Sequence, residues 1–230
     1  MKIVVTGASQ GIGYEIVKKL LSDTEHEVLA LARNKKNLKS LKKYALKATY
    51  HYYSFDLLKE DYHKELIPEI AECMGKVDVL INNAGLLISK PLQDLTNKDF
   101  DALFGINTKS AFKLVRDLLP FFNPNAHIVN ISSMGGFQGS AKFPGMSLYS
   151  ASKGALAILT ECMAEELKEK HIKVNALAIG AVQTEMLATA FPGYIAPVKA
   201  EEMADFIINF AQEGHHFLNG KIIPVSLSTP

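Results

Sequence analysis

The sequence has few of the features that mark disulfide-rich, membrane or nucleic-acid-binding proteins. Its 230 residues include two cysteines, Cys73 and Cys162, without a partner motif, which excludes a disulfide framework and indicates core packing in a reducing compartment. No apolar run approaches the roughly eighteen residues of a membrane span, and the N-terminus has no signal-peptide layout. The net charge of +1 and the lack of like-charge runs predict no nucleic-acid and no membrane partner. We therefore expect a soluble, cytoplasmic protein.

Signatures of hydrolases and metal sites are also missing. The sequence contains no Gly-x-Ser-x-Gly nucleophile elbow, and its seven histidines lie outside any nucleophile motif, which argues against a Ser-His-Asp hydrolase. The adjacent pair His215 and His216 is more typical of a solvated loop than of metal ligands. We expect no metal site.

Short apolar, β-branched runs alternate along the chain with segments of helical periodicity. The predicted strands are Lys2–Thr6, Glu27–Ala32, Thr49–Phe55, Val77–Ile81, His127–Ile131, Lys173–Ile179 and Lys221–Val225. An apolar content of 48% is enough for a sizeable core. We predict an α/β fold with a Rossmann-type, doubly wound parallel sheet of about seven strands, in a single domain over residues 1–230.

A glycine-rich turn joins the first predicted strand to the first predicted helix. It has the spacing Gly7-x-x-x-Gly11-x-Gly13. Glycines permit a tight turn and close approach of a ligand to the backbone, and the following helix N-terminus attracts a pyrophosphate. The order strand, glycine turn, helix favours nucleotide binding over an ordinary turn.

Two further strand ends carry candidate contacts for a dinucleotide. An acid after the second strand would bind a ribose 2′-hydroxyl, but the sequence has Ala32 followed by Arg33 there. A guanidinium can pair with a 2′-phosphate, so we favour that role for Arg33 over a solvated basic loop. Asp56 follows the third strand and fits either an adenine amine or the cap of a predicted helix near Lys59–Met74.

Two other groups of polar residues lie where a cofactor or further polar groups would explain them. The small turn Asn82-Asn83-Ala84-Gly85 follows the fourth strand, where it permits close approach of a cofactor or forms an ordinary turn. Asn107 lies among apolar residues of a predicted helix over Asp99–Leu119. A buried amide needs partners, so we expect polar groups beside Asn107.

Tyr149 and Lys153 are four residues apart in a segment of helical character, which places them on one face. An ammonium roughly 5 Å from a phenol favours the phenolate by about 3 kcal/mol at an effective dielectric near 20. A phenol with a pKa lowered in this way is a usable general acid or base. Alone, the spacing also occurs on many solvated helix faces.

Together these motifs resemble those of the short-chain dehydrogenases/reductases, in the family's order and over essentially the whole chain. The motifs that carry the resemblance are Thr6-Gly7-x-x-x-Gly11-Ile12-Gly13, Asp56-Leu57, Asn82-Asn83-Ala84-Gly85, Asn107, Ser133 and Tyr149-x-x-x-Lys153. The resemblance implies that Tyr149 exchanges a proton with the substrate oxygen and that Ser133, rather than Ser132, hydrogen-bonds this oxygen. It further implies that Lys153 lowers the pKa of Tyr149 and holds the nicotinamide ribose, and that Asn107 anchors a water.

The resemblance also implies a nicotinamide cofactor. The pair Ala32-Arg33 looks like the family's NADP-preferring pattern, with NAD(H) as the alternative. The residues expected to bind the cofactor are Thr6, Gly7, Ser9, Gln10, Gly11, Ile12, Gly13, Arg33, Asp56, Leu57, Asn83, Ala84, Gly85, Tyr149, Lys153, Gly180, Val182 and Thr184. The sequence departs from the family at Gln10, where some NADP-dependent members are basic, and at Ile179, where Pro is usual.

The expected function is NADP(H)-dependent hydride transfer between nicotinamide and a carbonyl or secondary alcohol. The alternatives are an NAD-dependent alcohol dehydrogenase and a non-catalytic, cofactor-binding regulatory protein. A substrate loop is expected near residues 185–197. Bulky apolar residues fit either a substrate pocket or the core: Phe137, Phe143, Met146, Met186, Leu187 and Phe191. By resemblance, the helices Thr108–Leu119 and Tyr149–Lys170 join the chains of a homodimer or homotetramer.

Overall fold

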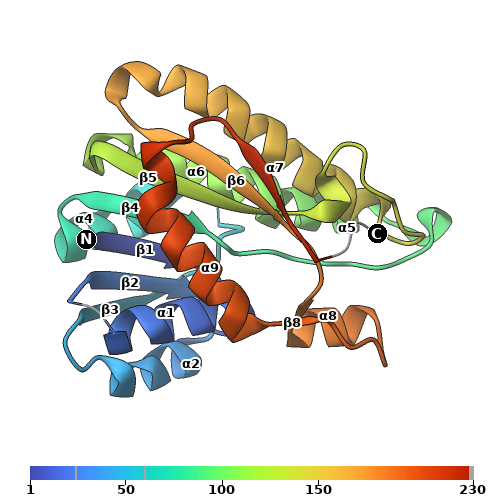
Figure 1. The fold of residues 1–230 in the computed structure, drawn as a ribbon, viewed down its shortest axis with the longest axis horizontal. Coiled ribbons are helices and arrows are strands. Elements are labelled where there is room, and N and C mark those ends of the chain that lie inside the picture. The colour runs from blue at the N-terminus through green and yellow to red at the C-terminus, as the bar shows by residue number, and fades with distance from the viewer. Residues whose placement is uncertain (24, 60, 228–230) are drawn as a thin grey trace.

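Parallel strands form the central sheet of the computed structural model, which describes residues 1–23, 25–59 and 61–227 (Figure 1). The sheet has seven strands in the spatial order β3-β2-β1-β4-β5-β6-β9. Their bounds are Lys2–Thr6 (β1), Glu27–Ala32 (β2), Thr49–Ser54 (β3), Val77–Asn82 (β4), Phe122–Ser133 (β5), Lys173–Ile179 (β6) and Ile222–Val225 (β9). Every neighbouring pair is parallel. The predicted doubly wound, single-domain α/β fold is confirmed, and its strand order reverses direction between β1 and β4.

Helices cover both faces of this sheet (Figure 1). They are Gly11–Asp23 (α1), Lys35–Ser40 (α2), Tyr62–Glu65 (α3), Ile67–Met74 (α4), Asn97–Phe104 (α5), Ser110–Leu118 (α6), Ser147–Glu166 (α7), Glu185–Ala190 (α8) and Ala200–Glu213 (α9). Within the described residues, none of them has both the length and the apolar character needed to cross a bilayer.

Each face of the sheet has its own apolar core, because the strands are buried on both sides. One core joins α1 and α9 to the sheet, with Ile16 and Ile207 both fully buried. The other joins α4, α6 and α7, with Ile70 and Leu114 at 1% exposure. Strands covered on both faces explain the near-continuous apolar runs in the sequence.

Several predicted elements differ from the structure in detail. The helix expected over Lys59–Met74 is two helices, α3 and α4, with a proline at the start of α4; residue 60 lies outside the described residues. A small parallel sheet of Val182–Gln183 (β7) and Val198–Lys199 (β8) was not expected. Both cysteines are free, but Cys162 is exposed, so its expected place in the core is wrong.

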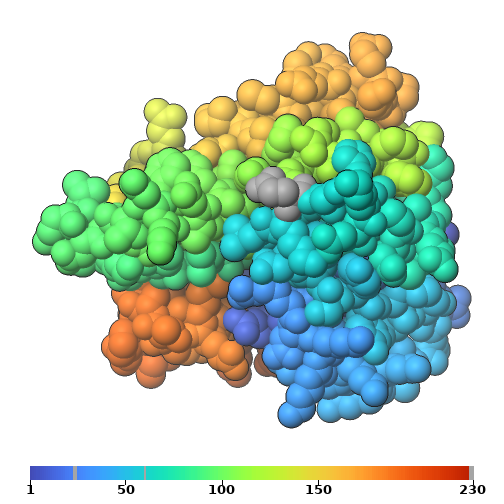
Figure 2. Space-filling model, turned by 180° about the vertical axis from the view of Figure 1, so that it is seen from behind, coloured from blue at the N-terminus to red at the C-terminus, as the bar shows by residue number. Residues whose placement is uncertain are grey.

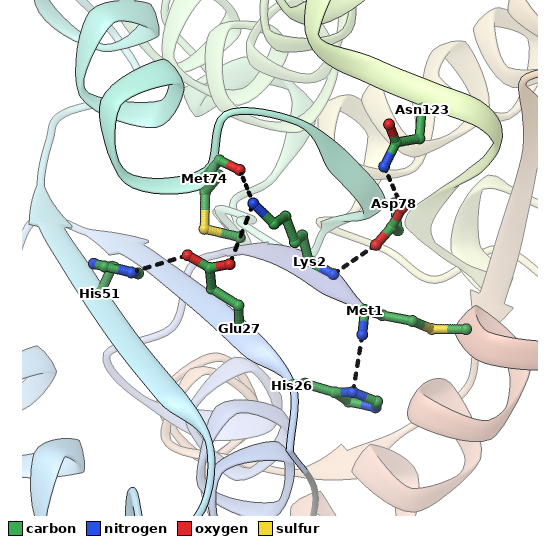
Figure 3. A network of polar contacts seen from close by, with 8 residues as sticks. All are labelled: Met1, Lys2, His26, Glu27, His51, Met74, Asp78 and Asn123. Atoms are coloured by element: carbon green, nitrogen blue, oxygen red, sulfur yellow. Dashed lines mark hydrogen bonds and ion pairs between the residues drawn. The ribbon is translucent and has the colours of Figure 1, made fainter.

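A polar network fastens the amino ends of the strands, at the edge opposite the strands' carboxyl ends (Figure 3). Asp78 accepts hydrogen bonds from the backbone amide of Lys2 at 2.7 Å and from the side chain of Asn123 at 2.6 Å. Glu27 pairs with Lys2 at 3.4 Å and with His51 at 3.2 Å. These contacts link the amino ends of β1, β2, β3, β4 and β5 to one another.

His127 is a buried histidine held in its neutral form between β5, β6 and α9. Its Nδ1 lies 2.9 Å from the Ala211 carbonyl oxygen, so Nδ1 carries the proton. Its Nε2 lies 3.0 Å from the amide nitrogen of Asn175, which donates to it. Burial lowers the pKa of His127 to about 4, and the nearby ring of His215 contributes in the same direction.

We predict that this histidine makes the fold sensitive to acid. The folded pKa lies below the ordinary value near 6.5, so the stabilisation is complete above pH 6.5 and is lost as pH falls toward 4. Urea unfolding at pH 7 and pH 4.5 should show a loss of about 2–3 kcal/mol. His127→Asn should be less stable at pH 7 but should lose less between the two pH values; an equal loss in both proteins would contradict the prediction.

Candidate active site

A cavity of about 560 Å³ lies at the carboxyl ends of the strands, beside the point where the strand order reverses. Its walls come from the turns after β1, β2, β3, β4 and β6, from the end of β5 and from α7. In the space-filling view, a hollow separates the orange segment that includes α8 from the blue segment that includes α2 (Figure 2). Open α/β sheets bind ligands at this position.

The glycine turn after β1 forms one wall, and its shape depends on three glycines. Gly7 and Gly11 have φ of 68° and 55°, a conformation that side chains disfavour. A Cβ on Gly13 would lie 2.4 Å from both the Gly7 carbonyl oxygen and the Asn83 amide nitrogen. The turn is therefore packed directly against the segment after β4, and α1 begins at Gly11 with its free amides toward the cavity.

Thr6 and Asn83 hold this turn in place. The Thr6 hydroxyl accepts a hydrogen bond from the Ala84 amide at 3.0 Å, and the Asn83 side chain donates to the Thr6 carbonyl at 3.0 Å. Thr6 and Gly13 do not line the cavity. They shape the loop that Gly7, Gly11 and Ala84 present, so their part in cofactor binding stays a prediction and would be indirect.

The far end of the cavity is bordered by Ala32, Arg33 and Asn34 at the end of β2. Arg33 is exposed, and its guanidinium has no ion-pair partner among the described residues. Asp56 lines the same end and accepts a hydrogen bond from the Leu58 amide at 3.0 Å. It therefore caps a turn, whereas the cap of the following helix, α3, is Asp61, which accepts from the Lys64 amide. The helix-cap alternative for Asp56 is thus wrong, and its contact with an adenine amine stays a prediction.

Tyr149 and Lys153 lie on one face of α7, and both line the cavity. Lys153 is 4% exposed and donates from Nζ to the Ile131 carbonyl oxygen at 2.7 Å. The first turns of α7 can approach the end of β5 this closely because Gly136 and Gly154 are in contact. A Cβ on Gly136 would lie 2.5 Å from the Gly154 amide nitrogen.

Burial raises the pKa of the Tyr149 hydroxyl, and a hydrogen bond with Ser133 partly opposes this rise. Burial also lowers the pKa of Lys153 to about 8. The expectation that Lys153 lowers the pKa of Tyr149 is therefore wrong for this structure. Loss of water disfavours the charged form of each group, and an interaction between Lys153 and Tyr149 is not among the causes of either shift.

The two serines at the end of β5 have different surroundings. Ser132 is 2% exposed, and its hydroxyl donates to the Lys153 carbonyl oxygen at 2.9 Å, so it fastens α7 to β5. Ser133 is half-buried, accepts a hydrogen bond from the Gly135 amide at 3.1 Å and bonds Tyr149. Ser132 lines the cavity, whereas Ser133 does not. The choice of Ser133 as the residue beside the reacting oxygen stays a prediction, supported by its hydrogen bond with Tyr149.

Asn107 lies in a π-helical turn, Gly105–Lys109, that interrupts the helix expected over Asp99–Leu119. Its carbonyl oxygen accepts from the Leu86 amide at 2.8 Å, and its amide donates to the Leu86 carbonyl and to Ser152, both at 2.9 Å. The predicted polar neighbours are thus the backbone after β4 and a residue of α7. Asn107 connects these two walls of the cavity. Single π-helical turns within α-helices occur frequently at functional sites.

A family model described as short chain dehydrogenase matches residues 1–194. The chain belongs to the short-chain dehydrogenase/reductase family. A 3-oxoacyl-(acyl-carrier-protein) reductase FabG from Thermotoga maritima is 30% identical over 96% of this chain and 94% of its own length. This protein is an oxidoreductase of that family.

Two solved structures show the likeness of fold for this short-chain dehydrogenase. A short chain dehydrogenase from Burkholderia cenocepacia in complex with NADP is 26% identical, covers 97% of this chain and 95% of its own, and has a TM-score of 0.85. A 4-hydroxyisoleucine dehydrogenase mutant complexed with NADH and succinate is 25% identical, covers 98% and 97%, and also has a TM-score of 0.85.

Most of the predicted cofactor residues of this short-chain dehydrogenase line the cavity, and four do not. Gly180 packs against Ser226, where an added Cβ would lie 2.4 Å from the Ser226 hydroxyl oxygen, and Val182 is buried in β7. Thr6 and Gly13 act through the glycine turn, as described above. The cavity residues that sequence reasoning did not single out are mainly apolar: Phe55, Leu58, Leu86, Ile106, Ile131 and Ile179, with Asn34 and Glu185.

Four of the six bulky apolar residues that fit either a substrate pocket or the core line one of two cavities, and Leu187 and Phe191 line neither of these two. Met186 lines the main cavity, whereas Phe137, Phe143 and Met146 line a second one of about 730 Å³. The two cavities share no lining residue among those described. The second cavity lies beside the side chains of Ser147, Ser150 and Ala151 of α7 rather than beside Tyr149, so the expectation of one apolar pocket is not met in this structure.

Proposed function

We propose that this protein is an NADP(H)-dependent reductase of a carbonyl group, or a dehydrogenase of the matching secondary alcohol. The observation that carries the proposal is the placement of Tyr149 and Lys153 side by side in the wall of a cavity that the glycine turn also lines. The bound cofactor would supply or accept the hydride at its nicotinamide ring. The protein's own groups bind it, position the substrate oxygen and move a proton.

The residues of the cavity fit such a dinucleotide along its length. The amides of the turn Gly7–Gly11 and of the start of α1 suit a pyrophosphate. A Cβ on Gly85 would lie 3.5 Å from Lys153 Nζ and 3.6 Å from the Asn107 side-chain oxygen. The gap at Gly85 thus opens onto the buried ammonium, which we assign to the nicotinamide ribose.

Proton transfer to the substrate oxygen is assigned to Tyr149. Because burial raises its pKa, the hydroxyl is protonated at neutral pH and serves as an acid when a carbonyl is reduced. Ser133 shares a hydrogen bond with Tyr149 and would hold the same oxygen. A regulatory protein that only bound the cofactor would need no phenol, serine and buried ammonium in this arrangement, which weighs against the non-catalytic alternative.

The substrate side is assigned to the loop near residues 185–197, whose first residues Glu185 and Met186 border the cavity. We also infer a homodimer or homotetramer. Large apolar side chains stay exposed on the two helices that the resemblance assigns to contacts between chains: Phe112 of α6 is 40% and Ile158 of α7 is 61% exposed. Exposed apolar groups on adjacent helices suit such a contact.

Tyr149→Phe should lower turnover by about 10²–10⁴-fold, because it removes the proton donor and little else. The fold should be retained, and cofactor affinity should stay within a few fold. Steady-state rates on a carbonyl that the wild type reduces, together with a fluorescence titration of NADPH, measure both effects. Near-normal turnover by Tyr149→Phe would contradict the assignment.

Lys153→Met provides the complementary variant. It should weaken NADPH binding as well as turnover, because a ribose contact is lost with the ammonium. An apolar group of similar length in this buried position should leave the fold intact. If Lys153→Met binds NADPH as tightly as Tyr149→Phe does, the ribose assignment is wrong.

Arg33 should select NADP(H) over NAD(H). A charge-assisted contact to the 2′-phosphate is worth about 1.5–3 kcal/mol, or roughly ten- to a hundredfold in affinity. The double variant Ala32→Asp/Arg33→Ala should shift the ratio of the two dissociation constants toward NADH by at least that factor. Equal binding of NADH and NADPH to the wild type, measured by fluorescence titration, would overturn the preference and support the NAD-dependent alternative.

A further inference from the structure

One exposed segment next to the cavity is strongly basic although the whole chain is nearly neutral. Residues 33–47 hold seven of the chain's 25 basic residues and none of its 24 acidic ones, so the segment carries +7 and the rest of the chain −6. The seven are Arg33, Lys35, Lys36, Lys39, Lys42, Lys43 and Lys47, and all are exposed. The expectation of no local charge accumulation, drawn from the net charge, is therefore wrong for this segment.

These side chains are not neutralised by neighbouring carboxylates. Over the described residues, none of the seven takes part in an ion pair. Other surface lysines of the molecule do, as Lys18 with Glu15 at 2.9 Å and Lys90 with Asp99 at 2.9 Å show. The basic segment thus presents its full positive charge to solvent.

The segment is fixed relative to the cavity. Leu38 and Leu41 are fully buried beneath it. The Asn37 side chain donates to the Ser9 carbonyl oxygen in the glycine turn at 2.9 Å, which ties α2 to the cavity wall. The blue segment that includes α2 borders the hollow seen in Figure 2. Arg33 and Asn34 belong to both the cavity wall and this segment, so its charge begins at the cavity mouth.

We propose that the exposed lysines of α2, Lys35, Lys36 and Lys39, steer the phosphate-bearing adenosine end of NADPH toward the cavity. The proposal rests on the proposed function and concerns the rate of cofactor capture, not contact in the bound state. The cavity itself is lined by two carboxylates, Asp56 and Glu185, and the rest of the chain is negative. An anionic dinucleotide is therefore attracted to the cavity only where the neighbouring surface is positively charged, which is the end at α2.

The range of the interaction matches the geometry. Six helical residues span about 9 Å, so these lysines lie within roughly one Debye length of Arg33 at 0.1 M salt and well within it at 0.01 M salt. A 2′-phosphate adds about 1.5–2 negative charges near pH 7. Attraction of this kind raises association rates and weakens as salt is added. The effect should be stronger for NADPH than for NADH.

The test is stopped-flow measurement of cofactor association with the full-length protein, using NADPH and NADH at several salt concentrations. Lys35→Gln/Lys36→Gln/Lys39→Gln should lower the NADPH association rate by about fivefold at 10 mM salt, and the difference should nearly vanish at 0.5 M. The dissociation rate, and turnover at saturating NADPH, should be unchanged. The NADH association rate should fall by less.

Lys168→Gln/Lys170→Gln/Lys221→Gln is the charge-matched control, because it also removes three exposed lysines, which precede β6 and the edge strand β9 on the other side of the sheet. It should leave the association rate unchanged. The proposal is overturned if the α2 variant associates with NADPH as fast as the wild type, or if the control slows association equally. Absence of any NADPH binding to the wild type would instead refute the proposed function, and the two failures are thus distinguishable.

Discussion

The close contact between the start of α7 and the end of β5 is the constraint on which the site depends. Gly136 and Gly154 touch. Beside them, the Ser132 hydroxyl donates to the Lys153 carbonyl oxygen, and the Lys153 ammonium donates to the Ile131 carbonyl oxygen. Deeper in the sheet, Asn130 joins Asn82 at 2.8 Å and Thr160 at 2.9 Å, so β4, β5 and α7 share one buried polar chain. A helix held at several points along its length presents side chains with little freedom, as positioned catalysis requires.

Burial at this contact also sets the chemistry of the groups it holds. The same loss of water that raises the pKa of Tyr149 lowers the pKa of Lys153 to about 8. Both shifts favour the uncharged form of the group, because burial disfavours its charge. A protonated phenol beside Ser133 suits donation to a carbonyl oxygen, whereas the ammonium is held on the Ile131 carbonyl at 2.7 Å.

Local patterns in the sequence predict the sheet and most of the cavity wall. Every strand of the main sheet follows from a short run of apolar, β-branched or aromatic residues. Gly7, Arg33, Gly85 and Tyr149 fall at strand ends or on α7, where motifs place them. Features that depend on packing were missed. The π-turn at Asn107 and the raised pKa of Tyr149 follow from tertiary contacts. The basic segment could have been found in the sequence by summing charge over short windows, because the net charge of +1 averages it with the negative remainder of the chain.

Direct transfer of hydride from cofactor to substrate tests the account most directly. Wild-type protein would be incubated with NADPH deuterated at C4, in each stereochemical form, and with a panel of steroid, acyl, sugar and aromatic ketones. Mass spectrometry of the products then locates the label. The account predicts that one of the two forms delivers deuterium to the carbinol carbon of at least one product. A panel without cofactor-dependent products, or products without deuterium from either form, would contradict it.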